Sequence, residues 1–327
     1  MKSVQLNYKY VNLLITICLF LGLFTVGSLL YTGFFSLQVF LNMLIDNAFL
    51  IITAVGMTFV LIIGGIDISI GSVIALVCML SAYLLEMKHL NPFVVILAML
   101  AMGALFGLIQ GWFISSFKIQ PFIVTLAGMF LARGLCYVIS IDTIMISDPF
   151  YHMMATYRIP LPLGTSISVS VLIALAVVLG ALYLINYTKF GRTAYAIGGN
   201  EQSALLMGLP VVRTKVLIYT LNGFCSALAG IVFSFYMLSG YGLHAVGLEM
   251  DAIASAVIGG TPLTGGIGFV TGTLFGVLIQ GVIQTLIMFQ GTLSSWWTKI
   301  AIAFLLCVFI ILQRLIGARK ESRKSIA

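Results

Sequence analysis

The sequence predicts an all-α, polytopic membrane protein. The chain has 327 residues, of which 61% are hydrophobic and 8% are charged, whereas soluble domains carry about a quarter charged residues. Apolar segments with almost no charge recur at a length of about 20 residues, which lets a helix cross a hydrocarbon layer about 30 Å thick. Because a helix satisfies its own backbone hydrogen bonds and an open sheet in lipid does not, each segment is expected to be a helix.

Ten such segments follow one another along the chain. We expect membrane-spanning helices at 11–31, 43–63, 70–86, 93–116, 123–140, 167–187, 216–237, 251–263, 268–290 and 299–316, the eighth being short. The first segment has no small-residue cleavage site after it, so we interpret it as a retained helix and not as a signal peptide. The connections leave no room for a separate soluble domain, and residues 1–327 are predicted to form one transmembrane domain.

The basic residues indicate the orientation of these helices. If the N-terminus is inside, most Lys and Arg residues fall at cytoplasmic ends, as the positive-inside rule requires. Both termini are then cytoplasmic, residues 188–215 form the longest cytoplasmic loop, and residues 317–327 form a basic cytoplasmic tail. The net charge of +7 therefore reflects topology, and no nucleic-acid partner is expected.

Glycines in the fourth and ninth predicted helices recur every four residues, a spacing typical of close helix contacts. They are Gly103, Gly107 and Gly111 in one helix and Gly268, Gly272 and Gly276 in the other. The two helices also share a phrase, FGLIQG at 106–111 and FGVLIQG at 275–281. Since these helices run in opposite directions, the match indicates either an inverted repeat of five plus five helices, as in many transporters, or chance.

Polar residues within the apolar segments are the candidates for a translocation pathway. An ionisable group at mid-membrane costs at least about 2.5 kcal/mol and therefore faces a partner or a water-filled cavity. Structural roles compete with the pathway role: helix capping, anchoring to carbonyl groups, or interhelical hydrogen bonds. Asp46 and Asn47 are expected to cap the start of the second helix. The pathway or gate candidates are Asp67, Ser69, Gln110, Arg133, Asn222, Thr261, Gln280 and Gln284.

Two glycine-rich blocks interrupt the helical pattern. GGIDISIG at 64–71 separates the second and third helices, and GGTPLTGG at 259–266 follows the eighth. Glycine permits a tight turn and proline breaks a helix. Irregular backbone at membrane depth is tolerated where it lines protein or water, so both blocks are candidates for a gate or pathway.

A short helix is predicted in the long cytoplasmic loop. Asn200 can cap it, Glu201 lies in its first turn, and Gly208 can end it before Pro210. A helix of about seven residues is marginal in water and needs a surface to pack against. That surface is either the protein's own membrane face or a cytoplasmic partner. The candidate contact residues are Gly198, Gly199, Asn200, Glu201, Ser203, Leu205, Leu206 and Gly208.

The chain carries no signature of covalent chemistry. The phosphate-binding pattern GxxxxGKS or GxxxxGKT is missing from the sequence, as are HExxH and any plausible nucleophile beside a histidine. The five cysteines lie in apolar segments and form no CxxC pair. We therefore expect no enzyme activity, no metal site and no cofactor bound by this chain, and ATP, if used, would be bound by another subunit.

Several motifs together resemble the ribose-type sugar permeases, the membrane subunits of bacterial ABC importers. The resemblance covers nearly the whole chain, and Pro262 departs from the aliphatic or serine residue of the family's glycine block. The segment 291–300, GTLSSWWTKI, is similar to the last outer loop of the galactofuranose-type branch. The motifs that carry the resemblance are AVGMTFV at 54–60, GGIDISIGS at 64–72, TLAGM at 125–129, FGRTAYAIGGN at 190–200 and GGTPLTGGIG at 259–268.

The resemblance implies a multi-pass permease of the bacterial cytoplasmic (inner) membrane. Such a permease pairs with a second permease, identical or paralogous, with cytoplasmic ATPase subunits that bind ATP and Mg²⁺, and with an extracytoplasmic sugar-binding protein. The segment around Gly198 to Gly208 would be the coupling helix seated in the ATPase. The alternative function is a secondary transporter of a small polar solute, which would need a functional carboxylate within the membrane.

Overall fold

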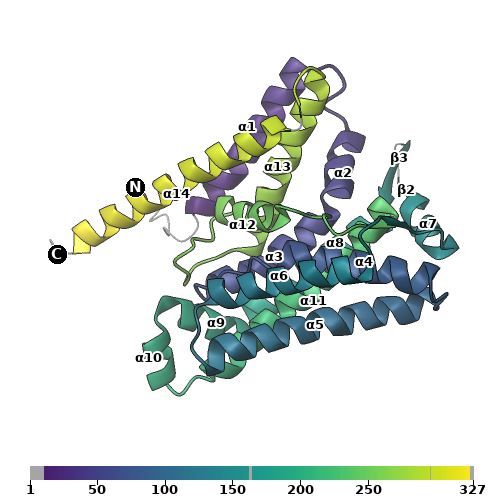
Figure 1. Cartoon of the computed structure of the whole chain (residues 1–327). Helices are drawn as coiled ribbons and strands as arrows, with labels where there is room; N and C mark the ends of the chain where they lie inside the picture. Colours follow the sequence, from purple (N-terminus) through teal and green to yellow (C-terminus); the bar gives the residue numbers. More distant parts are fainter. Residues whose placement is uncertain (1–10, 162–163, 295, 325–327) are drawn as a thin grey trace.

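The structure is a computed structural model that describes residues 11–161, 164–294 and 296–324, and most of it is helical (Figure 1). The all-α prediction is therefore confirmed. The helices are α1 (Val11–Leu30), α2 (Leu37–Asp46), α3 (Ala48–Ile62), α4 (Ile70–Glu86), α5 (Pro92–Ser116), α6 (Pro121–Ile139), α7 (Pro149–Thr156), α8 (Val169–Tyr187), α9 (Lys189–Gly199), α10 (Glu201–Leu206), α11 (Val211–Met237), α12 (Leu248–Ile258), α13 (Val270–Gln290) and α14 (Trp296–Lys324).

Each of the ten predicted membrane segments corresponds to one main helix. Six helices in the described part of the chain are long and apolar enough to cross a membrane: α1, α5, α6, α8, α11 and α13. The pair α2 and α3 adds a seventh, broken span, and α4 and the apolar part of α14 are shorter. The predicted short eighth segment is α12, which has 11 residues.

The second span departs from the prediction at its start. It begins at Leu37 instead of residue 43 and bends by 61° between α2 and α3. Asp46 ends α2, and the Asn47 side chain makes no capping bond to α3 but donates to the Met43 carbonyl (2.9 Å). The prediction that Asp46 and Asn47 cap this helix was wrong, because Asp46 belongs to α2 and the Asn47 side chain bonds back to α2.

Four short strands form two antiparallel pairs, which the sequence did not predict. They are β1 (Ile144–Met145), β2 (Arg158–Leu161), β3 (Thr165–Ser168) and β4 (Ser239–Gly240), and β1 pairs with β4 while β2 pairs with β3. In Figure 1 the β2–β3 hairpin and α7 lie at the end of the molecule opposite to α9 and α10. The two ends therefore differ in structure: one carries the hairpin and α7, and the other carries α9 and α10.

The contact between α5 and α11 confirms that glycines mark close helix packing. A Cβ atom added to Gly103 would collide with Ala227, and one added to Gly107 or Gly111 would collide with Tyr219. Because these three positions have no side chain, the two backbones can approach closely. Inside lipid the hydrophobic effect does not drive helices together, so the van der Waals contacts of this close approach stabilise the pair.

Glycines of the ninth predicted helix also lie in close contacts. Gly272 and Gly276 of α13 face the Gly259 and Ser255 carbonyl groups of α12, while Gly268, just before α13, lies against the end of α3. Helix α13 is therefore held against two other elements, and both glycine predictions hold.

The contacts between helices agree with an inverted repeat, because corresponding helices of the two halves make corresponding contacts. In that repeat α3, α4 and α5 correspond to α11, α12 and α13. Helix α5 packs on α11 as α13 packs on α3, and α4 packs on α11 as α12 packs on α3. The repeat stays a prediction, with this exchange of contacts in its favour.

Candidate functional site

Four of the predicted pathway residues meet in one buried hydrogen-bonded cluster, which we call the Asp67 cluster: Asp67, Ser69, Gln110 and Asn222. Asp67 Oδ1 accepts hydrogen bonds from the Ser69 backbone N–H (2.9 Å) and the Ser69 hydroxyl (2.6 Å). Asp67 Oδ2 accepts from Asn222 Nδ2 (2.7 Å), and Gln110 Nε2 donates to Ser69 Oγ (3.0 Å). The cluster links the α3–α4 connection to α5 and α11.

The cluster lies just before α4 and explains how that helix begins. Ser69 is the residue before α4, but its hydroxyl bonds to Asp67 and Gln110 and makes no capping bond to the helix. Asp67 instead accepts the hydrogen bond from the Ser69 backbone N–H just before the helix start. The donors around Asp67 stabilise its carboxylate, which would otherwise be costly to bury.

Tyr219 and Glu249 also belong to this region, although neither was predicted from the sequence as a site residue. The Tyr219 hydroxyl is buried beside Gly65 and, among the described residues, has no hydrogen-bond partner. Glu249 Oε2 is likewise buried without a partner in the described part of the chain, and it lies against Gly71 in the first turn of α4. A negative charge at a helix N-terminus is favoured by the helix dipole, which fits both Glu249 and Asp67.

Arg133 anchors a loop in this structure. Its Nη1 atom donates to the carbonyl oxygens of Gly242 (2.6 Å) and His244 (2.7 Å), in the connection between α11 and α12. Burial lowers the pKa of the His244 imidazole, which favours a neutral ring next to the guanidinium. Of the two roles expected for Arg133, the observed bonds are those of a carbonyl anchor.

The remaining pathway candidates do not join the Asp67 cluster. Thr261 is buried, and its hydroxyl accepts a hydrogen bond from the Phe269 N–H (3.4 Å) across the second glycine block. Gln280 is buried on α13 and donates to the Asp251 carbonyl of α12 (2.9 Å). Gln284 lies one turn further along α13 and is partly exposed. Thr261 and Gln280 therefore make hydrogen bonds between neighbouring elements of the second half of the chain.

The charged stretch around α10 forms a compact, well-capped unit. Asn200 Oδ1 accepts a hydrogen bond from the Ser203 N–H (2.8 Å), as predicted for the cap, and Gly208 has a φ of +74°. Helix α10 has six residues, Glu201–Leu206. The Glu201 carboxylate pairs with Lys215 at the start of α11 (2.6 Å), which ties both ends of the loop together.

The exposure of the residues in and just after α10 bears on the two packing partners that were expected. Ala204 is fully buried against the rest of the chain, whereas Leu205 is 62%, Leu206 89% and Met207 67% exposed. One small residue therefore faces the protein's own membrane domain, and three large apolar side chains point away from it. Large apolar side chains gathered at one exposed spot are typical of a protein contact.

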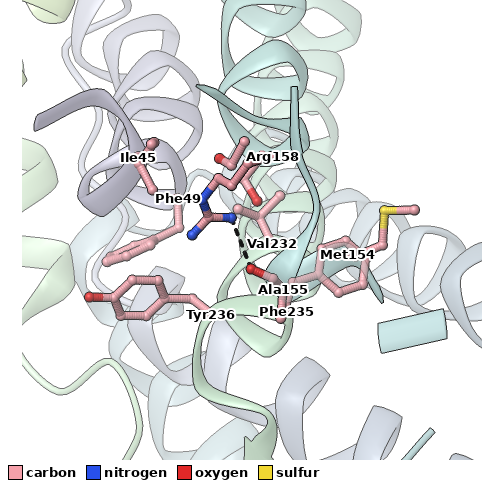
Figure 2. Close-up of a pocket in the computed structure, with 10 residues that line it drawn as sticks. Ile45, Phe49, Met154, Ala155, Arg158, Val232, Phe235 and Tyr236 are labelled. Carbon is pink, nitrogen blue, oxygen red and sulfur yellow. Dashed lines mark hydrogen bonds between the residues drawn. The ribbon is translucent and has the colours of Figure 1, made fainter. Parts of the chain in front are cut away.

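A separate small pocket lies near the bend between α2 and α3 (Figure 2). The Arg158 guanidinium points into it and donates to the Ala155 carbonyl (2.9 Å), while Phe49 and Tyr236 lie side by side across the pocket. Most of its other lining residues are apolar. The pocket shares no residue with the Asp67 cluster or with α10.

No group of three or more His, Cys, Asp or Glu side chains that could hold a metal ion occurs within residues 11–161, 164–294 and 296–324. The five cysteines are free thiols, three of them buried.

Comparison with known proteins supplies the family. Residues 39–311 match the family model described as "Branched-chain amino acid transport system / permease component". Over 309 residues the chain is 50% identical to the inner membrane ABC transporter permease protein YjfF of Escherichia coli, with 93% of both chains covered. The chain belongs to the ribose-type ABC sugar permease family.

Other relatives of this permease cover nearly the full chain. It is 38% identical to the fructose import permease protein FruG of Bifidobacterium longum (99% of this chain, 96% of the relative). It is 35% identical to the ribose import permease protein RbsC of Escherichia coli (89% and 90%). No solved structure matches the chain. The permease is thus a multi-span membrane protein, and its relatives are transport subunits.

Proposed function

We propose that this permease imports a monosaccharide across the bacterial inner membrane with energy from a separate ATPase. The observation that carries the proposal is the exposed apolar face of α10, Leu205 to Met207, on a capped helix of six residues. A helix this short is not stable by itself in water, and within the described part of the chain Ala204 is the only residue of α10 that is buried. A cytoplasmic ATPase that binds ATP and Mg²⁺ is the partner that fits this face.

In this account α10 is the coupling helix. Closure of two ATPase subunits on ATP would move α10 and, through α9 and α11, the membrane helices, so that the pathway opens to one side at a time. A second permease, identical or paralogous, completes the pathway, and an extracytoplasmic binding protein delivers the sugar. This permease makes and breaks no covalent bond.

The coupling role is tested by a double substitution, Leu205→Glu with Leu206→Glu. Charges on this face should abolish ATP-driven uptake while the protein still inserts into the membrane, because the apolar contact with the ATPase is lost. Uptake, ATPase co-purification and membrane content are measured together. Gln202→Glu is the matched control, since it adds a charge to an exposed position of the same helix without removing apolar surface. Normal coupled uptake in the double variant would refute the docking role.

Galactofuranose is the sugar we propose, on the resemblance of residues 291–300 to that branch of the family. The named relatives include ribose and fructose import permeases, so the choice must be tested against those sugars. In cells expressing the complete transporter, unlabelled galactofuranose should compete with labelled galactofuranose far better than ribose or fructose does. Equal competition by ribose would reject the assignment.

A secondary transporter would require a carboxylate that an ion can reach from the pathway. Two carboxylates lie in this region: Asp67 is buried and accepts hydrogen bonds from Ser69 and Asn222, whereas Glu249 is half-buried and its Oε2 atom has no partner among the described residues. Asp67 is therefore explained as an anchor between α4 and α11. We favour the ATP-driven importer because the exposed apolar residues of α10 need a partner, which a secondary transporter would not supply.

A further inference from the structure

Three glycine-containing segments meet backbone to backbone beside α10, and we call this contact the glycine junction. The segments are the end of α3 with its following turn (62–65), the last three residues of the second glycine block (264–266), and the end of α9 (198–199). Figure 1 shows α9 directly before α10 at this end of the molecule. The junction therefore joins the coupling segment to two irregular turns of the membrane domain.

Gly198 is the centre of the junction. A Cβ atom added there would collide with the Ile62 carbonyl oxygen and with the backbone nitrogen of Gly266 (2.5 Å). Both neighbours are main-chain atoms, which cannot rotate away as a side chain would. Gly198 does not have a positive φ, so the requirement for glycine here comes from space alone.

The two turns are also joined directly to each other. The Gly266 N–H donates to the Ile62 carbonyl (2.8 Å), and a Cβ atom on Gly265 would lie 2.7 Å from the Gly64 nitrogen. Gly64, Gly265 and Gly266 all have positive φ values, which glycine adopts without strain. The turns thus form one unit, and α9 rests on both of them.

A hydrogen bond from a side chain reinforces the contact. The Tyr195 hydroxyl of α9 donates to the Gly268 carbonyl (2.7 Å), two residues before α13 begins. On the other side, the turn at 62–65 is followed after two residues by Asp67 and after five by Ile70, the first residue of α4. A shift of α9 is therefore applied close to the first residues of α4 and of α13.

We infer that the glycine junction transmits the movement of α10 to α4 and α13, and that Gly198 and Tyr195 are positioning residues for transport. Backbone packed on backbone leaves no rotamer freedom to absorb a displacement, so even a small movement of α9 must move both turns. Packed protein of this kind moves between discrete arrangements and does not deform smoothly. The inference rests on the proposed function, because it assumes that α10 receives the ATPase.

The test is Gly198→Ala in the complete transporter, purified through a tag on this permease and reconstituted into lipid vesicles. The variant should keep its ATPase bound and hydrolysing, while the number of sugar molecules imported per ATP falls by about 2- to 30-fold. Gly180→Ala is the matched control, since Gly180 is also a helical glycine and has no atom within 4 Å of an added Cβ. The control should import sugar with the wild-type ratio.

A second variant covers the case in which Gly198→Ala does not reach the membrane. Tyr195→Phe keeps the ring and removes the bond to Gly268. It should lower the imported-sugar-to-ATP ratio by about twofold, at the low end for residues along a coupling network, with an unchanged melting temperature. A wild-type ratio in Gly198→Ala, or in Tyr195→Phe when the first variant fails to fold, would overturn the inference.

The experiments distinguish a failure of the glycine-junction inference from a failure of the proposed function. If the wild-type permease co-purifies with no ATPase, or imports sugar uphill without ATP, the proposed function fails whatever the variants do. If wild-type transport needs the ATPase and Gly198→Ala transports normally, only the junction is rejected.

Discussion

At the scale of single residues, the Asp67 cluster shows what the sequence can and cannot reveal. Asp67, Ser69, Gln110 and Asn222 were each identifiable as polar residues in apolar surroundings, but nothing in the sequence said that they touch one another. Asp67 and Asn222 are 155 positions apart and meet only because α11 packs across the α3–α4 connection. Tyr219 was missed because a tyrosine in an apolar helix is common, and only the structure shows that its buried hydroxyl has no hydrogen-bond partner among the described residues.

The bond between Asp67 and Asn222 can be tested by exchanging the two residues. Asn222→Asp places two carboxyl groups 2.7 Å apart and should lower the free energy of unfolding by about 1–3 kcal/mol. Adding Asp67→Asn restores a donor opposite an acceptor, while the new asparagine can still accept from Ser69. The exchange should therefore recover more than half of the loss, measured by thermal unfolding in detergent. An exchanged protein as unstable as the single variant would show that the pair does not interact as described.

At the scale of secondary-structure elements, the apolar segments gave the main helices within a few residues, since length and hydropathy are enough to define a span. The bend between α2 and α3 was missed because neither glycine nor proline marks it. The β2–β3 hairpin was missed because its strands have four residues each, too few for a periodic pattern. The short α10 was predictable for a different reason: its cap and its terminating glycine are local signals.

The close contact between α5 and α11 makes a quantitative prediction. Gly107→Ala should lower the free energy of unfolding by about 1–3 kcal/mol, because the added methyl group meets the Tyr219 carbonyl oxygen and forces the helices apart. Gly180→Ala in α8 has open space around it and should be neutral or stabilising by up to about 1 kcal/mol. Thermal unfolding of both variants in the same detergent checks the difference. Equal stability of the two would mean that the glycine spacing in α5 does not determine this packing.

At the scale of the whole molecule, the distribution of basic residues predicts that the α9–α10 end is cytoplasmic and that the β2–β3 end lies outside. The structure separates these two ends (Figure 1), and the orientation itself is a prediction from charge. In a background with Cys18 and Cys307 replaced, Ser203→Cys should react with an impermeant maleimide only when the cytoplasmic face is accessible. Tyr157→Cys, at an exposed position before the hairpin, should react only from outside. Labelling of Ser203→Cys in intact cells would show that the orientation is the opposite of the predicted one.

The central claim is that a separate ATPase subunit moves α10 and that the membrane helices move with it. Its most direct test is sugar accumulation in vesicles that contain the purified permeases and binding protein, with and without the ATPase subunits. The account predicts uphill accumulation only when the ATPase and ATP are both present, with a proton or sodium gradient unable to replace them. Accumulation driven by an ion gradient in the absence of any ATPase would contradict it.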